Sequence, residues 1–146
     1  MERNPVKKGD KLKIYVDGAS RGNSGPAASA FLFVHNGEII HSECDFIGTA
    51  TNNTAEYQAI INSLKVAKRF SRGHIQVYSD SNLAVQQINK KWKINYPHLS
   101  KMCGEVYKLC EKYEKVEFLH VGRNNPYIQK CDKLCNERLD TEGFKK

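Results

Sequence analysis

The sequence lacks a long hydrophobic run and a leader-like segment. No stretch of its 146 residues approaches the ~20 consecutive apolar residues that a helix needs to span a bilayer. Residues 1–10 are polar and contain lysines, so they lack the apolar stretch of a signal peptide. We therefore expect a cytoplasmic protein, or a nuclear one if the source has a nucleus, without membrane contact.

Paired cysteine motifs are also absent. The five cysteines are odd in number and form no C-x-x-C pair. Without a leader, free reduced thiols are the expected state, and structural zinc sites usually have closer ligand pairs. Cys131 and Cys135 are spaced by about one helical turn, and we predict that they pack as small core residues. The full set is Cys44, Cys103, Cys110, Cys131 and Cys135.

The chain has no internal repeat, low-complexity segment or linker. Its composition is 40% hydrophobic and 27% charged, as in ordinary globular proteins. We predict one domain over residues 11–140, preceded by a flexible lead-in at 1–10 and followed by a tail at 141–146. We expect a monomer.

Aspartate and glutamate are fewer than lysine and arginine, which leaves a formal net charge of +7. A basic surface attracts polyanions and speeds their encounter, so nucleic acid is the natural partner. Charge alone does not exclude a protein that is basic for other reasons. Carboxylates inside such a positive field would suit a site where metal ions mediate between acids and phosphates.

Three strands are predicted first, over residues 11–16, 27–34 and 38–47. The stretch from Gly18 to Pro26 is rich in turn residues, and Asn36-Gly37 is a strong hairpin signal. These strands should form an antiparallel meander. A helix over 53–70 follows, with one apolar face made of Ile60, Ser63, Leu64, Ala67 and Phe70.

Strands and helices alternate in the remaining sequence. We predict a strand at 75–79, helices at 82–89 and 97–113, a strand at 116–121 and a helix at 127–139. In the longer helix, Leu99, Met102, Val106, Leu109 and Cys110 lie near one face. The fold class is therefore α/β, a five-stranded mixed sheet of three antiparallel and then parallel strands, flanked by helices.

Two aspartates stand where strands are predicted to end. Asp17 precedes the glycine-rich stretch, so we expect it at the edge of the sheet rather than in its core. Asp80 follows the strand at 75–79 and precedes a helix. Ligands often bind beyond the carboxyl ends of parallel strands. A turn aspartate or a helix N-cap would give the same local pattern.

Glu56 and Asp132 are predicted on helices. If Asn53 is the N-cap, Glu56 occupies the capping-box position. Glu56 also leans toward the apolar face, where a carboxylate needs a partner and a metal would supply one. Asp132 lies early in the last helix, where a solvent-facing acid near the positive end of the helix dipole is the alternative.

Together the four acids predict a cluster, although each alone is a weak signal. Hard divalent cations such as Mg²⁺ prefer oxygen ligands. Two such ions can activate a water and stabilise the leaving oxygen in a phosphoryl displacement. The sequence thus favours metal-dependent phosphodiester chemistry.

Four segments resemble the motifs of the ribonuclease HI family. They are Tyr15–Asn23 (YVDGASRGN), Thr51–Glu56 (TNNTAE), Tyr78–Ser81 (YSDS) and Cys131–Leu134 (CDKL). Their order, spacing and strand–helix context agree with the family over residues 11–140, so the match is far more specific than any single motif.

The resemblance implies a ribonuclease H-like fold and a ribonuclease H enzyme. It implies hydrolysis of the RNA strand of an RNA–DNA hybrid, leaving 5′-phosphate and 3′-hydroxyl ends, with two Mg²⁺ or Mn²⁺ ions. The implied catalytic and metal-binding residues are Asp17, Glu56, Asp80 and Asp132. Residues implied to touch the minor groove, where amides can donate and accept, are Asn23, Asn52, Asn53 and Asn82. A turn followed by a helix cap also explains Asn52-Asn53, and both roles can coexist.

The sequence departs from well-known members in three places. The loop at 121–126 lacks the histidine that many carry; Arg123 could act there electrostatically but not as a general base, because it stays protonated. Ile128 stands where an asparagine is common. Residues 90–100 are too few for a basic helical protrusion, and Lys91 and Trp92 are expected to contact substrate instead. The alternative is a solvated cationic turn with Trp92 packed on the core. We expect no separate hybrid-binding domain before residue 11.

Two further hypotheses stay open. One is a catalytically weak or inactive module of this fold that binds RNA–DNA or double-stranded RNA. The other is a different nuclease of this fold, such as a junction resolvase or an exonuclease. The presence of all four acids favours an enzyme, and Asn52-Asn53 favours a ribonuclease. Double-stranded RNA is an open additional substrate, because recognition by minor-groove shape tolerates two RNA strands.

Overall fold

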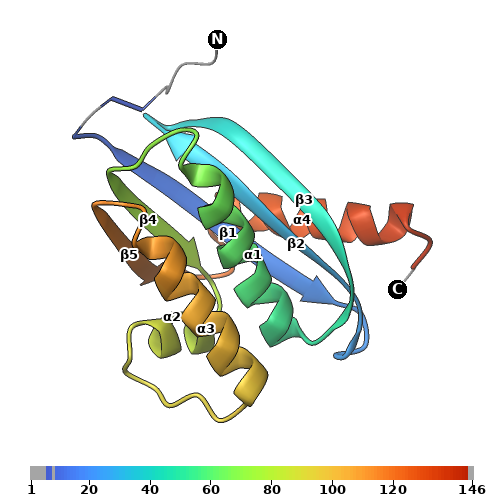
Figure 1. Cartoon of the computed structure of the whole chain (residues 1–146). Coiled ribbons are helices and arrows are strands. Elements are labelled where there is room, and N and C mark those ends of the chain that lie inside the picture. The colour runs from blue at the N-terminus through green and yellow to red at the C-terminus, as the bar shows by residue number, and fades with distance from the viewer. Residues whose placement is uncertain (1–5, 8, 145–146) are drawn as a thin grey trace.

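One mixed sheet organises the chain, whose computed structural model describes residues 6–7 and 9–144 (Figure 1). The strand order is β3-β2-β1-β4-β5. The strands are β1 (Lys11–Ser20), β2 (Gly25–His35), β3 (Glu38–Ala50), β4 (His74–Ser79) and β5 (Lys115–His120). β1, β2 and β3 pair antiparallel, whereas β4 runs parallel to β1 and β5 parallel to β4. The predicted sheet is confirmed.

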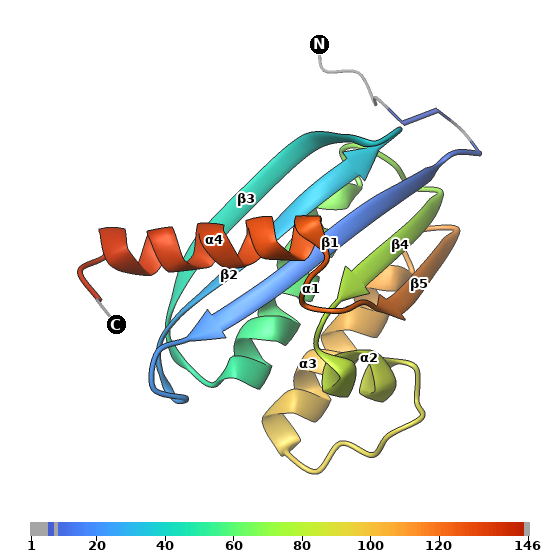
Figure 2. The same ribbon diagram turned by 180° about the vertical axis from the view of Figure 1, so that it is seen from behind.

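Helices cover both faces of this sheet. They are α1 (Asn52–Ala67), α2 (Asn82–Ile88), α3 (Pro97–Cys110) and α4 (Pro126–Thr141). α1 and α3 lie on one face (Figure 1), and α4 crosses the other face over β1, β2 and β3 (Figure 2). The predicted order of nine elements is confirmed.

Local sequence accounts for the hairpin between β2 and β3. Asn36 and Gly37 both adopt positive φ, 52° and 77°. A type I′ turn requires this backbone at both central positions, and asparagine and glycine tolerate it best. The predicted hairpin is confirmed.

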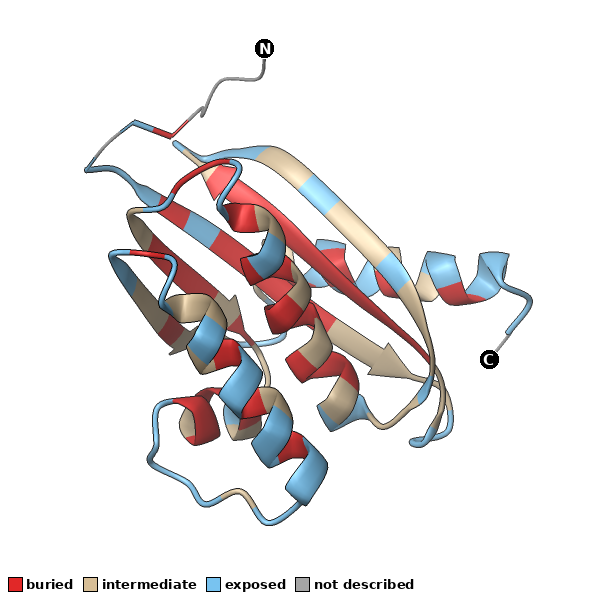
Figure 3. Ribbon diagram, in the orientation of Figure 1, coloured by how far each residue is buried: buried red, intermediate tan, exposed pale blue. Residues whose placement is uncertain are grey.

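The core lies mainly between the sheet and α1 (Figure 3). Ile60, Ser63, Leu64 and Ala67 are fully buried, as the predicted helical face requires. On the opposite face, Cys131 and Cys135 are also fully buried, and the Cys131 thiol donates to the carbonyl of Tyr15 at 3.4 Å. Their predicted role as small core residues is confirmed, and all five cysteines are unpaired.

One local expectation and two of the alternative interpretations are wrong. β1 continues to Ser20 because residues 18–20 pair with β2, so Asp17 lies inside the strand opposite Ala30 and is 6% exposed. Thr51, not Asn53, is the N-cap of α1, so Glu56 is not in a capping box. Ser81, not Asp80, caps α2. Both acids are thereby left without a capping role.

The chain ends contact the domain where they are described. Val6 is buried in the main core, and the ring of Phe144 stacks on Phe46 with centroids 5.5 Å apart. Residues 1–5 and 8 of the predicted lead-in, and 145–146 of the predicted tail, lie outside the described residues. No helix among residues 6–7 and 9–144 has both the length and the apolar character needed to cross a membrane.

Candidate active site

Three carboxylates from separate elements meet at the end of the parallel strand pair. Asp17 lies on β1, Glu56 on α1 and Asp80 directly after β4. One oxygen from each lies within 4.8 Å of the others. β1 and β4 are adjacent and in register up to Val16 and Ser79, so Asp17 and Asp80 follow side by side at the point where β4 ends. The structure thus brings together three of the four predicted acids.

Gly18 allows α1 to approach β1 closely enough to place Glu56. The Gly18 backbone N–H donates to Glu56 Oε1 at 2.6 Å. A Cβ at position 18 would lie only 2.3 Å from the carbonyl carbon of Ala55. Sequence reasoning did not single out this glycine, although its position directly after Asp17 was the available signal.

The electrostatics of the cluster indicate uncompensated negative charge. Burial, and then the charge of Asp80, raise the pKa of Asp17 to about 7, while a hydrogen bond with Glu56 acts in the opposite direction. Burial, and then the charges of Asp17 and Asp80, raise the pKa of Glu56 well above its ordinary value. Like charges this close disfavour simultaneous ionisation unless a cation offsets them.

A cavity of about 230 Å³ opens beside the cluster. Its lining residues are Asp17, Asp80, Arg123, Ile128, Gln129 and Asp132. Asp132 is exposed on α4 and belongs to this cavity rather than to the tight group of three. Sequence reasoning missed Gln129, whose only signal was its position three residues before Asp132. The fourth predicted acid therefore faces the same space from its open side.

Arg123 extends over the cavity from the loop before α4. Its Nε lies 3.5 Å from Asp80 Oδ2, although 92% of its side chain is exposed. A long, solvent-exposed side chain held by one ion pair is weakly fixed. Arg123 can therefore partly offset the carboxylate charge and can also move away.

Three of the four predicted asparagines lie at or beside the first turn of α1. The backbone N–H of Asn52 donates to Asn23 Oδ1 at 2.8 Å, and Asn52 Oδ1 accepts from the Ser20 N–H at 2.9 Å. Asn53 is exposed beside them. Because side-chain oxygens make these bonds, the amide nitrogens of Asn23 and Asn52 are left to donate. Asn82 stands apart on α2, where its Oδ1 accepts from Gln86.

Lys91 and Trp92 lie in the segment between α2 and α3 (Figure 1). Both are exposed, and Trp92 is 47% accessible. The alternative in which Trp92 packs into the core is therefore wrong. A nearby pair that sequence reasoning missed joins α3 to α1, where Thr54 Oγ1 and His98 Nε2 are 2.7 Å apart.

The donor set fits hard divalent cations. All the converging side chains offer carboxylate oxygens, which Mg²⁺ and Mn²⁺ prefer. Two of these carboxylates are almost completely buried with raised pKa values, the condition that a bound cation would relieve. Asp17, Glu56 and Asp80 could hold such a cation, and Asp132 could contribute from the rim of the cavity.

Comparisons with known proteins agree on one family. A family model described as reverse transcriptase-like matches residues 15–137. Ribonuclease HI of Halobacterium salinarum is 37% identical over 134 residues, which cover 91% of this chain and 66% of that protein. Ribonuclease H of Clostridium botulinum is 33% identical over 149 residues, covering 89% of this chain and 96% of that protein.

Solved structures give the same result. The crystal structure of the H. salinarum RNase H1 superposes with a TM-score of 0.84 at 37% identity, covering 90% of this chain and 98% of that one. LC11-RNase H1 in complex with an RNA/DNA hybrid gives a TM-score of 0.84 at 29% identity, with the same coverage. Some relatives are longer, and a bifunctional Mycobacterium tuberculosis protein is spanned over only 36% of its length.

Proposed function

Since this chain belongs to the ribonuclease HI family, we propose that it hydrolyses the RNA strand of RNA–DNA hybrids, using two Mg²⁺ or Mn²⁺ ions. The products would carry 5′-phosphate and 3′-hydroxyl ends. One observation carries the proposal: three carboxylates meet within 4.8 Å beneath an open cavity whose rim holds a fourth. The LC11-RNase H1 complex supports the hybrid as substrate.

The buried acids form a fixed floor for the reaction. The backbone of Asp17 is fixed within a paired strand, and the Glu56 carboxylate accepts a hydrogen bond from the Gly18 N–H. Bound divalent cations would supply Lewis acidity, which activates a water and stabilises the leaving 3′-oxygen. The protein's part is to hold those oxygen ligands in place where the phosphate arrives.

Substrate recognition falls to the asparagine group at the start of α1. Amide nitrogens donate to the minor-groove acceptors and 2′-hydroxyls that distinguish RNA-containing duplexes. Asn23 and Asn52 are fixed to each other, so they present these donors in a defined arrangement close to Glu56. Lys91 and Trp92 lie on a different exposed segment and would contact the backbone of the hybrid.

Arg123 would act through its charge alone. It stays protonated at neutral pH, so it cannot accept a proton. Among the described residues that line the cavity there is no histidine. Arg123 could contact the scissile phosphate while it stays near Asp80, because its guanidinium has five N–H donors and 92% of its side chain is exposed.

The decisive experiment offers labelled RNA–DNA, RNA–RNA and DNA–DNA duplexes with Mg²⁺ or Mn²⁺ and maps the product ends. We expect cleavage of the RNA strand of the hybrid, abolished by EDTA. Asp17→Asn should abolish cleavage while hybrid binding survives, and the exposed Asp45→Asn should cleave like the unmodified protein. Cleavage that persists in EDTA, or at full rate in Asp17→Asn, would overturn the metal-dependent proposal. Hybrid binding without cleavage by the unmodified protein would instead identify a binding module.

A further inference from the structure

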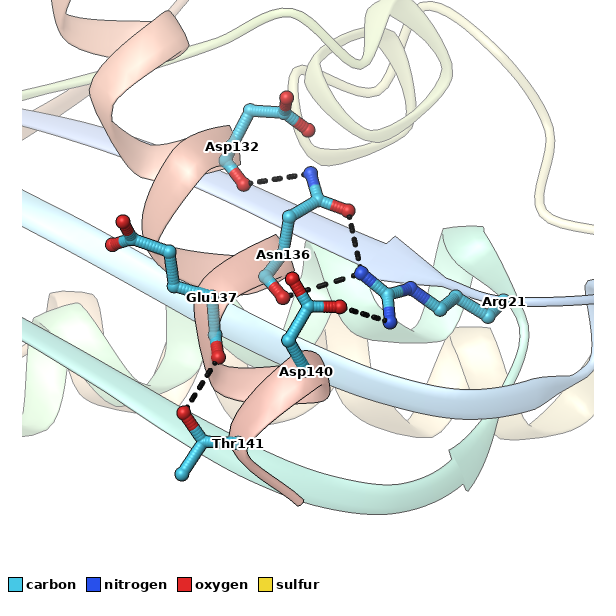
Figure 4. A network of polar contacts seen from close by, with 6 residues as sticks. All are labelled: Arg21, Asp132, Asn136, Glu137, Asp140 and Thr141. Carbon is cyan, nitrogen blue, oxygen red and sulfur yellow. Dashed lines mark hydrogen bonds and ion pairs between the residues drawn. The ribbon is translucent and has the colours of Figure 1, made fainter. Parts of the chain in front are cut away.

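Arg21 links the end of β1 to the helix that carries Asp132. Its side chain lies against α4 (Figure 4) and is 13% exposed. Nη1 donates to Asp140 Oδ1 at 2.9 Å. Nη2 donates to both the backbone oxygen and Oδ1 of Asn136, each at 3.2 Å. The guanidinium therefore spans two consecutive turns of α4.

The residues that receive Arg21 share one face of α4 with Asp132. Asp132, Asn136 and Asp140 follow one another at intervals of four, so they project from the same side of the helix (Figure 4). Asn136 Nδ2 also donates to the backbone oxygen of Asp132 at 3.0 Å. Fixing Asn136 and Asp140 therefore fixes the face that presents Asp132 to the cavity.

The turn that carries Arg21 is itself anchored. The Arg21 backbone N–H donates to the Pro26 oxygen at 2.9 Å, which closes the turn against β2. Ser20 and Asn23 on either side are bonded to Asn52 at the start of α1. Arg21 thus connects α4 to the same frame that holds Asp17 and Glu56.

Stability alone accounts poorly for this arginine. Among the described residues its Nε is a buried nitrogen with no hydrogen-bond partner, and such a group lowers the stability of the folded state. The Asp140 carboxylate is 58% exposed, so solvent weakens its ion pair. The planar guanidinium instead orients α4, because it binds two residues of that helix at fixed positions.

We propose that Arg21 is a positioning residue, which sets the rotation and height of α4 on the sheet so that Asp132 faces the three buried carboxylates. This inference rests on the proposed function, in which Asp132 completes the metal site. Asp132 needs such support, because it is exposed and lies outside the tight group.

The test compares Arg21→Met, which keeps the length of the stem, with Asp140→Ala and with a matched control, Arg138→Met. Arg138 also lies on α4, but it donates to Glu142 and to the oxygen of Cys44 on β3.

Mn²⁺ binding is measured by calorimetry without substrate, and cleavage is measured against Mn²⁺ concentration. Outer-shell partners of metal ligands typically change metal affinity ~10–100-fold. We expect about a tenfold weaker Mn²⁺ affinity in Arg21→Met, a smaller loss in Asp140→Ala and none in Arg138→Met.

Two readouts separate positioning from general damage. The KM for the hybrid should change by less than about twofold in Arg21→Met, since the asparagines stay in place. In an Asp132→Asn background, Arg21→Met should cause no further loss of Mn²⁺ affinity, because residues that act as a unit are non-additive. A full additional loss in that background, or unchanged affinity in both single variants, overturns the positioning role. If Arg21→Met does not fold, the Mn²⁺ affinity of Asp140→Ala, measured alone and in the Asp132→Asn background, decides instead. Failure of the unmodified protein to bind Mn²⁺ would overturn the proposed function itself.

Discussion

The Gly18 backbone N–H and Glu56 Oε1 lie 2.6 Å apart, which joins strand β1 to helix α1 at the centre of the site. The contact requires glycine because a Cβ there would meet the Ala55 backbone at 2.3 Å. One small residue therefore decides how close the Glu56 carboxylate comes to Asp17.

Gly18→Ala should damage both stability and activity. The helix must move away from the strand, and such overpacking typically costs ~1–3 kcal/mol. Displacing Glu56 by about 1 Å can lower turnover ~100-fold. Denaturant unfolding and cleavage rates measure both effects. The control is Gly104→Ala on α3, where a Cβ meets nothing within 4 Å and should stabilise the helix by roughly 0.5–1 kcal/mol. Equal behaviour of the two variants would refute the close-approach explanation.

Without metal, the protein should lose stability as the pH rises from about 4 to 7. Asp17 has a folded pKa of about 7 against an ordinary value of 3.8, so the folded state binds this proton more tightly than the unfolded state. The favourable contribution is complete below the unfolded pKa and disappears as the pH passes the folded pKa, at ~1.4 kcal/mol per pH unit of difference. Thermal melting in EDTA across this range measures it.

Asp17→Asn should remove much of that pH dependence and melt higher than the unmodified protein at pH 7.5 in EDTA. An amide carries no charge to bury beside Asp80 and Glu56. Asp45→Asn, a change at an exposed aspartate on β3, should leave the pH profile as it was. A lower melting temperature for Asp17→Asn at pH 7.5 would show that its ionised form is not destabilising.

Arg123→Ala should change turnover more than hybrid binding. The side chain touches Asp80 at the cavity but is otherwise in solvent, so its charge acts mainly where the phosphate reacts. We expect a fall in kcat of about tenfold, the effect of ~1.4 kcal/mol on a barrier. Steady-state kinetics with Arg69→Ala provides the comparison, because Arg69 is exposed just beyond the C-terminal end of α1 and pairs with Glu43 on β3. An unaltered kcat in Arg123→Ala would mean that this arginine does not contribute to turnover.

Lys91→Ala should weaken hybrid binding and reduce its dependence on salt. Each lysine that neutralises a phosphate contributes about one unit to the slope of log affinity against log salt concentration. Binding titrations at several salt concentrations test this. Lys112→Ala, just beyond α3 and also exposed, should keep the original slope. Identical slopes for Lys91→Ala and the unmodified protein would show that Lys91 does not contact the hybrid.

Sequence patterns predicted the elements whose signals are local. The Asn36-Gly37 turn and the apolar face from Ile60 to Ala67 each follow from residues within a few positions of one another. The end of β1 could not be predicted in this way. Residues 18–20 look like a turn, but they pair with residues 27–29 of β2, which compensates for their low strand propensity.

The residues of the site also differ in whether the sequence could predict them. Asp17, Glu56 and Asp80 could be proposed as a cluster because strand ends and family motifs mark them. The contacts that hold the site could not, because they join distant parts of the chain. Gly18 and Glu56 are 38 positions apart, and Arg21 and Asp140 are 119 apart. Neither pair leaves a spacing pattern in one sequence.

The four acids of the site come from β1, α1, the end of β4 and α4, the last helix. A chain emerging from the ribosome therefore exposes Asp17 long before Asp132 has been synthesised. The cavity closes into its final form only when α4 docks across β1 and β2 (Figure 2). A partly synthesised copy therefore lacks the fourth acid, and the site is complete only when the last helix has folded onto the sheet.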